Sequence, residues 1–154
     1  MALAVGDKVP DFELPTDGGG SLSKKDLLGQ KVVLYFYPKD DTSGCTKEAQ
    51  DFTALTKKFE KSGARIVGVS KDSVKKHDKF KEKYGIPYTL ISDEETSLCQ
   101  TFGVWVEKSM YGRKYMGIER ATFLIDEKGV IREIWRKVKV PGHADAVLEA
   151  CAAG

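Results

Sequence analysis

Short apolar runs alternate along the chain with longer stretches in which apolar residues recur every three or four positions. The first run, residues 32–37, is rich in β-branched and aromatic residues and stops at Pro38, which is typical of an interior strand. The next stretch places Ala49, Phe52 and Phe59 at helical spacing. The same reasoning predicts strands over residues 32–37, 64–70, 88–91, 121–125 and 130–135, helices over residues 46–62, 73–84 and 143–150, and short helical turns over residues 23–28 and after Asp93.

Polar residues and glycines mark where several of these elements begin and end. Ser73 is placed to cap the helix over residues 73–84, and Gly85 is placed to close it. The sequence Asp-Glu-Lys-Gly at residues 126–129 separates the last two strands and predicts a hairpin. The first twenty residues contain two prolines and three successive glycines, which indicate loops.

The order of elements predicts the fold class. Strands that alternate with helices form parallel pairs with right-handed crossovers, and the final hairpin adds antiparallel pairing. The expected fold is therefore α/β, with a central mixed β-sheet flanked by helices. With a cysteine after an early strand, this order is similar to the thioredoxin-like plan. A chain of 154 residues suits one domain, so residues 1–154 are expected to form a single thioredoxin-like domain.

Composition narrows the classes of function. The 25 basic and 23 acidic residues nearly cancel, and the lysines between residues 71 and 83 alternate with acidic and apolar residues. That pattern is typical of a solvated helix face and not of a nucleic-acid surface. No segment has the length of a membrane span, and the first residues do not resemble a secretory leader. We therefore expect an intracellular, cytoplasmic protein with no membrane or nucleic-acid partner.

The three cysteines, Cys45, Cys99 and Cys151, are widely spaced and odd in number, unlike a secreted disulfide framework. No Cys-x-x-Cys motif occurs, and the two histidines lie apart from the cysteines in sequence. A structural zinc site is therefore not expected.

Spacing alone leaves two interpretations of Cys45 open. At a helix start, unpaired main-chain N–H groups and the positive end of the helix dipole favour a thiolate, which is the nucleophilic form. Cys45 also lies four residues before Ala49 on the apolar stripe, as a small buried hydrophobic residue would. Asp40 and Asp41 would oppose ionisation unless they point to solvent.

The sequence around Cys45 adds a resemblance. The spacing Pro38-x-x-x-Thr42-x-x-Cys45 resembles the peroxiredoxin active-site motif, and residues 35–48 resemble the peroxiredoxin Q, or bacterioferritin comigratory protein, branch. Similar segments continue in the branch's order over nearly the whole chain. They lie at residues 68–70, 92–93, 102–104, 120–126 and 139–143.

The resemblance implies that Cys45 is the peroxidatic cysteine, that Thr42 and Arg120 hold the peroxide and the thiolate, and that Pro38 shields the pocket. The chemistry suits these residue types, because a thiolate must attack one peroxide oxygen while hydrogen bonds and positive charge stabilise the leaving alkoxide. Arginine offers a permanent charge in a rigid fork, and threonine a hydroxyl that both donates and accepts. For Glu48, two roles stay open: orienting Arg120, or serving as a first-turn acid that suits the helix dipole.

The chain departs from this branch at the positions where a resolving cysteine is common. Five residues after Cys45 stands Gln50, and the aligned part of the following helix contains Phe80 and Lys81. Ser43 replaces a usual second proline, which returns a main-chain N–H and some freedom to the loop. Ser43 could serve as an N-cap instead.

The other two cysteines are weaker candidates. Cys99 is expected to be a buried structural residue, with resolving Cys45 as the alternative. Cys151 lies near the end of the sequence and is expected to be exposed, where it could reach other molecules.

Together these features predict a thiol peroxidase that reduces hydrogen peroxide and organic hydroperoxides through a Cys45 sulfenic acid. It is expected to work in a one-cysteine mode with a thioredoxin-like protein or a small thiol as reductant, as a monomer or weak homodimer, and without metal, haem or flavin. The rival functions are a thioredoxin-type disulfide oxidoreductase, disfavoured by the missing Cys-x-x-Cys pair, and a non-catalytic redox sensor or binding module of the same fold. Catalytic peroxide consumption with excess thiol separates the three.

Overall fold

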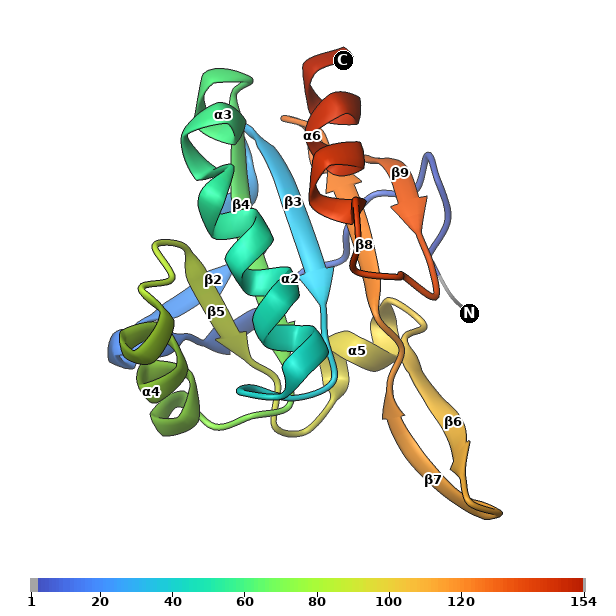
Figure 1. The fold of residues 1–154 in the computed structure, drawn as a ribbon. Coiled ribbons are helices and arrows are strands. Elements are labelled where there is room, and N and C mark those ends of the chain that lie inside the picture. The colour runs from blue at the N-terminus through green and yellow to red at the C-terminus, as the bar shows by residue number, and fades with distance from the viewer. Residues whose placement is uncertain (1–2, 154) are drawn as a thin grey trace.

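The computed structural model describes residues 3–153 and is built on one central five-stranded sheet (Figure 1). β3, β4 and β5 pair in parallel, whereas β8 is antiparallel to β3 and β9 is antiparallel to β8. The predicted α/β class and mixed sheet are confirmed. In spatial order the strands are β5 (Thr89–Ser92), β4 (Ala64–Ser70), β3 (Lys31–Phe36), β8 (Ala121–Ile125) and β9 (Ile131–Trp135).

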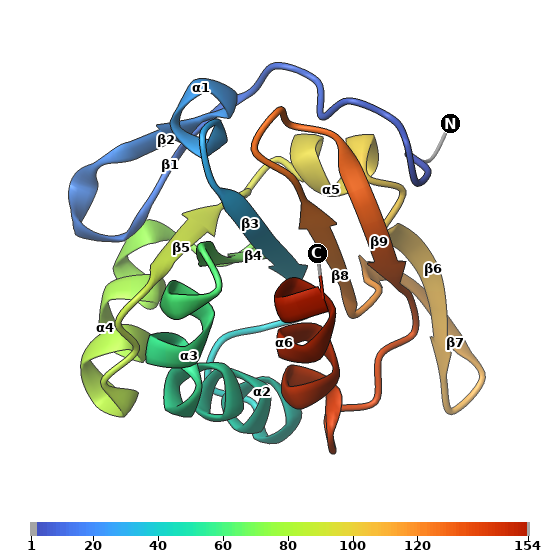
Figure 2. The ribbon, with the colours of Figure 1, turned by 90° about the horizontal axis from the view of Figure 1, so that it is seen from above.

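Helices cover both faces of this sheet, as Figure 2 shows from above. One face carries α2 (Ser43–Ala54), α3 (Thr56–Lys61), α4 (Val74–Tyr84) and α6 (His143–Ala153). The other face carries the shorter helices α1 (Lys24–Leu27) and α5 (Ser97–Thr101). Two separate hydrophobic clusters follow from this arrangement, one on each side of the sheet.

The central strand β3 contributes to both clusters. Its side chains alternate, so that Val33 and Tyr35 pack under α2 while Leu34 and Phe36 pack on the side of α5. All four are fully buried. A shift of one residue in register would exchange the two sets, so the packing fixes where the chain leaves β3 and turns towards α2.

The predicted helix over residues 46–62 is wrong at its start and in its continuity. It begins three residues earlier, at Ser43, and divides into α2 and α3 at Leu55. Leu55 has φ −101° and ψ 2°, and its N–H bonds Phe52 O. The Thr56 hydroxyl also donates to Phe52 O, at 3.1 Å. This local bonding competes with the helical ladder and explains the break.

Other predicted ends agree with the structure to within a few residues. The Ser73 hydroxyl accepts a hydrogen bond from Lys76 N, and Gly85 closes α4 with φ 62°. The turn over residues 126–129 joins β8 and β9 as predicted, and α6 continues to Ala153. Among residues 3–153, no helix combines the length and apolar character needed to cross a membrane.

Two antiparallel hairpins were not predicted. The pair β1 (Glu13–Pro15) and β2 (Ser21–Ser23) encloses the 3-10 turn η1 (Asp17–Gly19), and β6 (Trp105–Met110) pairs with β7 (Arg113–Ile118). The second hairpin projects from the body of the molecule (Figure 1), and most of its residues are exposed or half-buried. With little burial, neither of its strands shows the alternation of apolar and polar residues from which strands are predicted.

Candidate active site

Cys45 lies in the first turn of α2, directly after the loop that leaves β3. Thr42 is the N-cap residue, and the first helical hydrogen bond runs from Thr46 N to Thr42 O at 2.8 Å. The main-chain N–H groups of the first turn therefore have no partner within the helix. Only 2% of Cys45 is exposed. The sulfur thus lies at the electropositive end of a helix and is shielded from bulk solvent.

Arg120 approaches Cys45 from a distant part of the sequence. Its Nη2 donates to Cys45 Sγ at 3.3 Å, although the two residues are 75 positions apart in sequence. The pairing of β3 with β8 explains this approach, because it places Ala121 opposite Phe36. The residue before β8 therefore lies beside the loop after β3. The sheet register itself brings the guanidinium to the sulfur.

Gly44 makes room for this contact. A Cβ atom built at residue 44 would lie 3.2 Å from Arg120 Nη2. That separation is tighter than an ordinary van der Waals contact, so any larger residue would displace the guanidinium by a few tenths of an ångström. The sequence reasoning attached no role to Gly44, since its importance depends on an arginine that is distant in sequence.

Glu48 holds the other side of the guanidinium. Its Oε1 accepts from Arg120 Nη1 at 2.6 Å, and 1% of Glu48 is exposed. Burial raises the pKa of Glu48 from 4.5 to about 7, against the opposing effect of Arg120. Its second oxygen, Oε2, is buried without a hydrogen-bond partner among the described residues. Of the two roles left open for Glu48, this contact favours the orientation of Arg120.

Thr42 and Pro38 lie at the outer side of the loop. Thr42 is exposed, and its hydroxyl donates to Lys39 O at 2.8 Å, which leaves its lone pairs available as acceptors. Pro38 is half-buried. Ser43 is the first helical residue and not the N-cap. Asp41 binds Lys83 and Tyr84.

His143 is a buried neighbour of the site that sequence reasoning missed. It begins α6, its Nε2 shares a 2.8 Å hydrogen bond with Thr122 Oγ1, and its ring packs edge-on against Phe52. Burial, with the positive charge of Arg120, lowers the pKa of His143 to about 4. The imidazole is therefore neutral at pH 7. Its place in a Pro-Gly-His sequence before a helix was the one available signal.

Cys99 and Cys151 are both fully buried and both remote from Cys45. Cys99 lies in α5 within the hydrophobic cluster on the other face of the sheet from Cys45, as expected of a structural cysteine. Burial, with the charge of Asp93, raises the pKa of Cys99 far above its usual value. Asp93 also accepts from Cys99 N at 2.8 Å and so anchors the start of α5.

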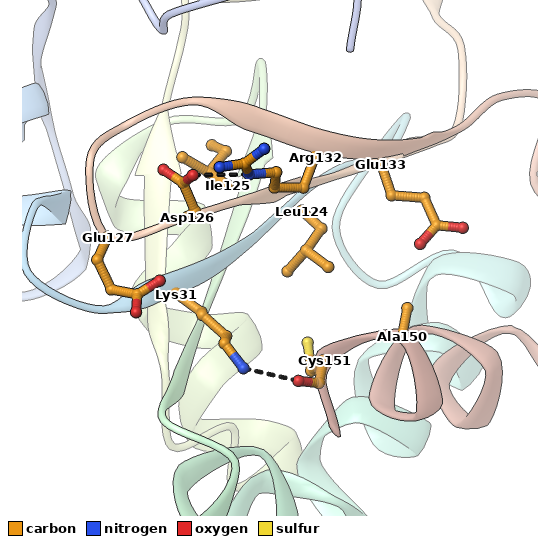
Figure 3. A pocket seen from close by; sticks show the side chains of 9 residues that line it. All are labelled: Lys31, Leu124, Ile125, Asp126, Glu127, Arg132, Glu133, Ala150 and Cys151. Atoms are coloured by element: carbon orange, nitrogen blue, oxygen red, sulfur yellow. Dashed lines mark hydrogen bonds and ion pairs between the residues drawn. The ribbon is translucent and has the colours of Figure 1, made fainter. Parts of the chain in front are cut away.

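The expected exposure of Cys151 is wrong, because α6 continues past it and packs its sulfur against the sheet. Lys31 donates to Cys151 O at 2.8 Å beside a cavity of about 360 Å³ (Figure 3). Lys31 begins β3 and Cys45 follows its end, so the two sulfurs are separated by roughly the length of a six-residue strand, about 20 Å. Burial raises the pKa of Cys151 to about 11.

Within residues 3–153, no three histidine, cysteine, aspartate or glutamate side chains gather in a way that could hold a metal ion. The site consists instead of one sulfur, one guanidinium and the first turn of a helix. This arrangement can stabilise a thiolate and a second anion beside it.

Comparison with known proteins places this geometry in a family. Residues 5–134 match the AhpC/TSA family. The chain is 55% identical over 148 residues to a putative peroxiredoxin bcp of Coxiella burnetii, covering 96% of this chain and 98% of that protein. It is 48% identical over 149 residues to peroxiredoxin Bcp of Bacillus subtilis, covering 97% and 95%.

Solved structures similar to this chain also belong to peroxiredoxins. A peroxiredoxin Q of Xylella fastidiosa superposes with a TM-score of 0.95 at 43% identity, covering 99% of this chain and 98% of that chain. A structure concerned with the alkyl peroxide reduction activity of Xanthomonas campestris bacterioferritin comigratory protein has a TM-score of 0.88 at 50% identity, covering 92% and 90%.

Replacing Glu48 with glutamine removes a carboxyl group whose pKa is raised. This should change how the free energy of unfolding depends on pH. Between about pH 4.5 and 7, the folded wild type binds more protons at Glu48 than the unfolded chain does, so this group lowers stability as pH rises. As pH rises through this window, the free energy of unfolding of the variant should therefore increase relative to that of the wild type by up to about 1.4 kcal/mol per pH unit. Above it the difference should level off. Urea unfolding at several pH values measures this, and a pH-independent difference would contradict it.

Gly44→Ala should slow the oxidation of Cys45 without lowering the thermal stability of the protein. Alanine favours the helix by up to about 1 kcal/mol over glycine, so thermal stability should not fall. The added methyl displaces Arg120 Nη2, so the rate constant for oxidation of Cys45 by hydrogen peroxide should drop roughly tenfold, the effect of losing about 1.4 kcal/mol from a charge-assisted hydrogen bond. Ser43→Ala, at the adjacent exposed position, is the control. Equal rates in the two variants would show that the contact has no kinetic role.

Proposed function

The chain belongs to the AhpC/TSA family, in its peroxiredoxin Q or Bcp branch, and we propose that it acts as a thiol-dependent peroxidase through the sulfur of Cys45. The observation that carries this assignment is the 3.3 Å contact between Arg120 Nη2 and Cys45 Sγ at the first turn of α2. No other cysteine among the described residues combines a cation with a helix start. Cys99 and Cys151 are buried with raised pKa values and are thiols at neutral pH.

The first chemical step forms a sulfur–oxygen bond and breaks the oxygen–oxygen bond. The Cys45 thiolate attacks the terminal oxygen of a hydroperoxide, becomes a sulfenic acid and releases an alkoxide, or hydroxide from hydrogen peroxide. The leaving oxygen then takes a proton and departs as alcohol or water. Negative charge moves from sulfur to the leaving oxygen during this step, and a guanidinium beside both atoms stabilises it throughout.

Each of the surrounding residues has a role in this scheme. Arg120 supplies the charge, and Glu48 holds the guanidinium in place from its other side. Thr42, at the N-cap, is positioned to bind the peroxide through its hydroxyl oxygen, since its proton is directed to Lys39 O. Pro38 limits access of water to the sulfur from the β3 side of the loop.

Hydrogen peroxide and small organic hydroperoxides are the proposed substrates. The alkyl peroxide reduction activity named for the Xanthomonas campestris relative supports the inclusion of organic hydroperoxides. The near-complete burial of Cys45 favours substrates with a slim reactive end.

The sulfenic acid is then reduced by an external thiol. A first thiol displaces water and forms a mixed disulfide with Cys45, and a second thiol releases the reduced enzyme and leaves with a disulfide of its own. A thioredoxin-like protein or a small thiol supplies these equivalents. This one-cysteine mode is supported by the placement of Cys99 across the sheet and of Cys151 at the far end of β3, since a disulfide requires α-carbons within about 7 Å.

We further propose that residues 1–154 form one domain that works in the cytoplasm as a monomer or weak homodimer. The cytoplasm suits it because thioredoxin and glutathione systems keep thiols reduced there. The rival thioredoxin-type oxidoreductase is disfavoured because the sequence has no second cysteine within three residues of Cys45.

Cys45→Ser tests the assignment of the nucleophile. The swap is nearly isosteric, so the fold should persist while turnover of hydrogen peroxide with excess dithiothreitol falls to the background rate. Cys99→Ser is the matched control and should turn over like the wild type. Activity that survives in Cys45→Ser would place the reacting sulfur elsewhere, and a wild type that consumes a single equivalent would indicate a sensor.

The one-cysteine mode has its own test. One equivalent of peroxide without reductant should leave Cys45 as a sulfenic acid, and excess peroxide should add two or three oxygen atoms to it, because no internal thiol reaches it. Mass spectrometry of the intact protein and its peptides measures both states. Cys99→Ser and Cys151→Ser should each retain turnover with a small thiol. A Cys45–Cys99 disulfide that forms faster than overoxidation would make Cys99 the resolving residue.

A further inference from the structure

A second set of buried polar groups holds the loop between β3 and α2 from the side of α4. Asp40, in the middle of this loop, accepts from the Tyr37 hydroxyl through Oδ1 at 2.6 Å and contacts His77 Nδ1 through Oδ2 at 2.6 Å. Its own main-chain N–H donates to Asp72 Oδ2 at 2.8 Å. Asp72 is in turn held by the Ser70 hydroxyl. Both carboxylate oxygens of Asp40 and its amide are therefore engaged.

His77 belongs to α4 and is fully buried. Its second ring nitrogen, Nε2, contacts Ile91 O in β5 at 2.9 Å. A carbonyl oxygen can only accept, so Nε2 carries a proton. An ionised carboxylate also only accepts, so Nδ1 opposite Asp40 carries a proton as well. The geometry therefore describes an imidazolium that joins the loop to β5 through one planar ring.

The charges around His77 agree with this protonation state. Burial lowers the pKa of His77, but the hydrogen bond and charge of Asp40, with Ile91 O and the charge of Asp72, outweigh burial and raise it above 6.5. The titratable groups that face the ring are Asp40 in the loop, Asp72 after β4 and Tyr37 directly after β3. Each carboxylate favours the cation.

We propose that His77 is a positioning residue for the peroxidase reaction: through Asp40 it keeps the loop and the first turn of α2 folded, so that Cys45 stays against Arg120. We call the contact between these two side chains the His77–Asp40 clamp. The inference rests on the proposed function of Cys45. It goes beyond it, because neither residue of the clamp touches the sulfur.

The loop needs such a clamp for reasons visible in its backbone. Asp41 has φ 57°, a left-handed conformation that is unfavourable for a residue with a side chain. Ser43 stands where a proline would have stiffened the entry to α2. A helix start is also where a helix frays most easily. Without the clamp, unwinding of residues 41–45 would carry the sulfur away from its cation.

The clamp also makes the loop sensitive to alkaline pH. Because the folded-state pKa of His77 is raised, its stabilising effect is complete below about pH 6.5 and is lost as pH rises through the folded-state pKa. Loss of the proton leaves a neutral imidazole that keeps its Nε2–H on Ile91 O and turns an unprotonated Nδ1 towards the Asp40 carboxylate, so the donor that holds the loop is lost. The exposure of Cys45 should therefore increase on the alkaline side.

Two substitutions separate the two contacts of the ring. The side-chain amide of asparagine places an N–H near the position of Nδ1, whereas that of glutamine reaches the position of Nε2. His77→Asn thus keeps a donor for Asp40, and His77→Gln keeps one for Ile91 O. Lys81→Met is the control, because it breaks an ion pair of the same helix with Asp17, away from the loop.

The readouts are the rate of Cys45 alkylation by N-ethylmaleimide, followed by peptide mass spectrometry, and the rate of Cys45 oxidation by hydrogen peroxide. In His77→Gln, alkylation should be about tenfold faster and oxidation about tenfold slower than in the wild type. His77→Asn and Lys81→Met should stay within about twofold of the wild type. The alkylation rate of the wild type should also show an alkaline rise that His77→Asn, which does not titrate there, lacks.

Alkylation does not require turnover, so this test stands apart from the proposed function. A failed peroxidase assignment would appear as absent turnover in all forms, with the alkylation differences intact. Equal alkylation rates in the wild type and His77→Gln would overturn the clamp. The clamp would also be overturned if the Cys45 alkylation rate rose equally in His77→Asn and His77→Gln and in proportion to their loss of thermal stability. That result would mean that His77 only stabilises the core. If His77→Gln does not fold, Asp40→Ala, which removes the oxygen that contacts Nδ1, should give the same opposite changes in the two rates, and unchanged rates in it would overturn the clamp.

Discussion

The antiparallel pairing of β3 with β8 is the constraint on which the site depends. It sets Ala121 opposite Phe36, so that the residue entering β8 and the loop leaving β3 share one end of the sheet. Cys45 and Arg120 meet for this reason, and not because of any local attraction between their segments. The register is in turn fixed by burial of β3 on both faces, since a shift by one residue would place every side chain in the wrong cluster.

The same sheet keeps the three sulfurs apart. Cys45 and Cys99 pack on opposite faces, and Cys151 shares the face of Cys45 but lies near the first residue of β3. A disulfide between any two of them would require the sheet or a whole helix to rearrange. Burial also keeps Cys99 and Cys151 protonated, so that proximity alone would not make them nucleophiles. This separation of the three sulfurs is the structural basis of the proposed reduction of Cys45 by an outside thiol.

Much of this structure could be predicted from the sequence, because it depends on strongly periodic segments. The run at residues 32–37, the cap at Ser73 and the turn at residues 126–129 each carry a local signal, and each was found. The break at Leu55 was not predicted, because it depends on a hydroxyl bonded to a main-chain carbonyl. The hairpin of β6 and β7 was not predicted either, because it buries few side chains. The burial of Cys151 was not predicted, because it results from the packing of α6 on the sheet, which is a tertiary contact.

The site was predictable in a different way. The resemblance named Cys45 and Arg120 but could not reveal Gly44, His143 or His77, whose roles depend on atoms brought together only by the fold. Geometry also shows how the charge of Arg120 is divided. His143 is neutral at pH 7, with a pKa near 4, and does not compete with the guanidinium as a cation. Glu48, whose pKa is about 7, is only partly ionised there and neutralises Arg120 only in part. Among residues 3–153, the other side chain that accepts from this guanidinium is the sulfur of Cys45. In the proposed reaction, burial of the Glu48 carboxylate therefore leaves positive charge on Arg120 for the thiolate and the departing oxygen.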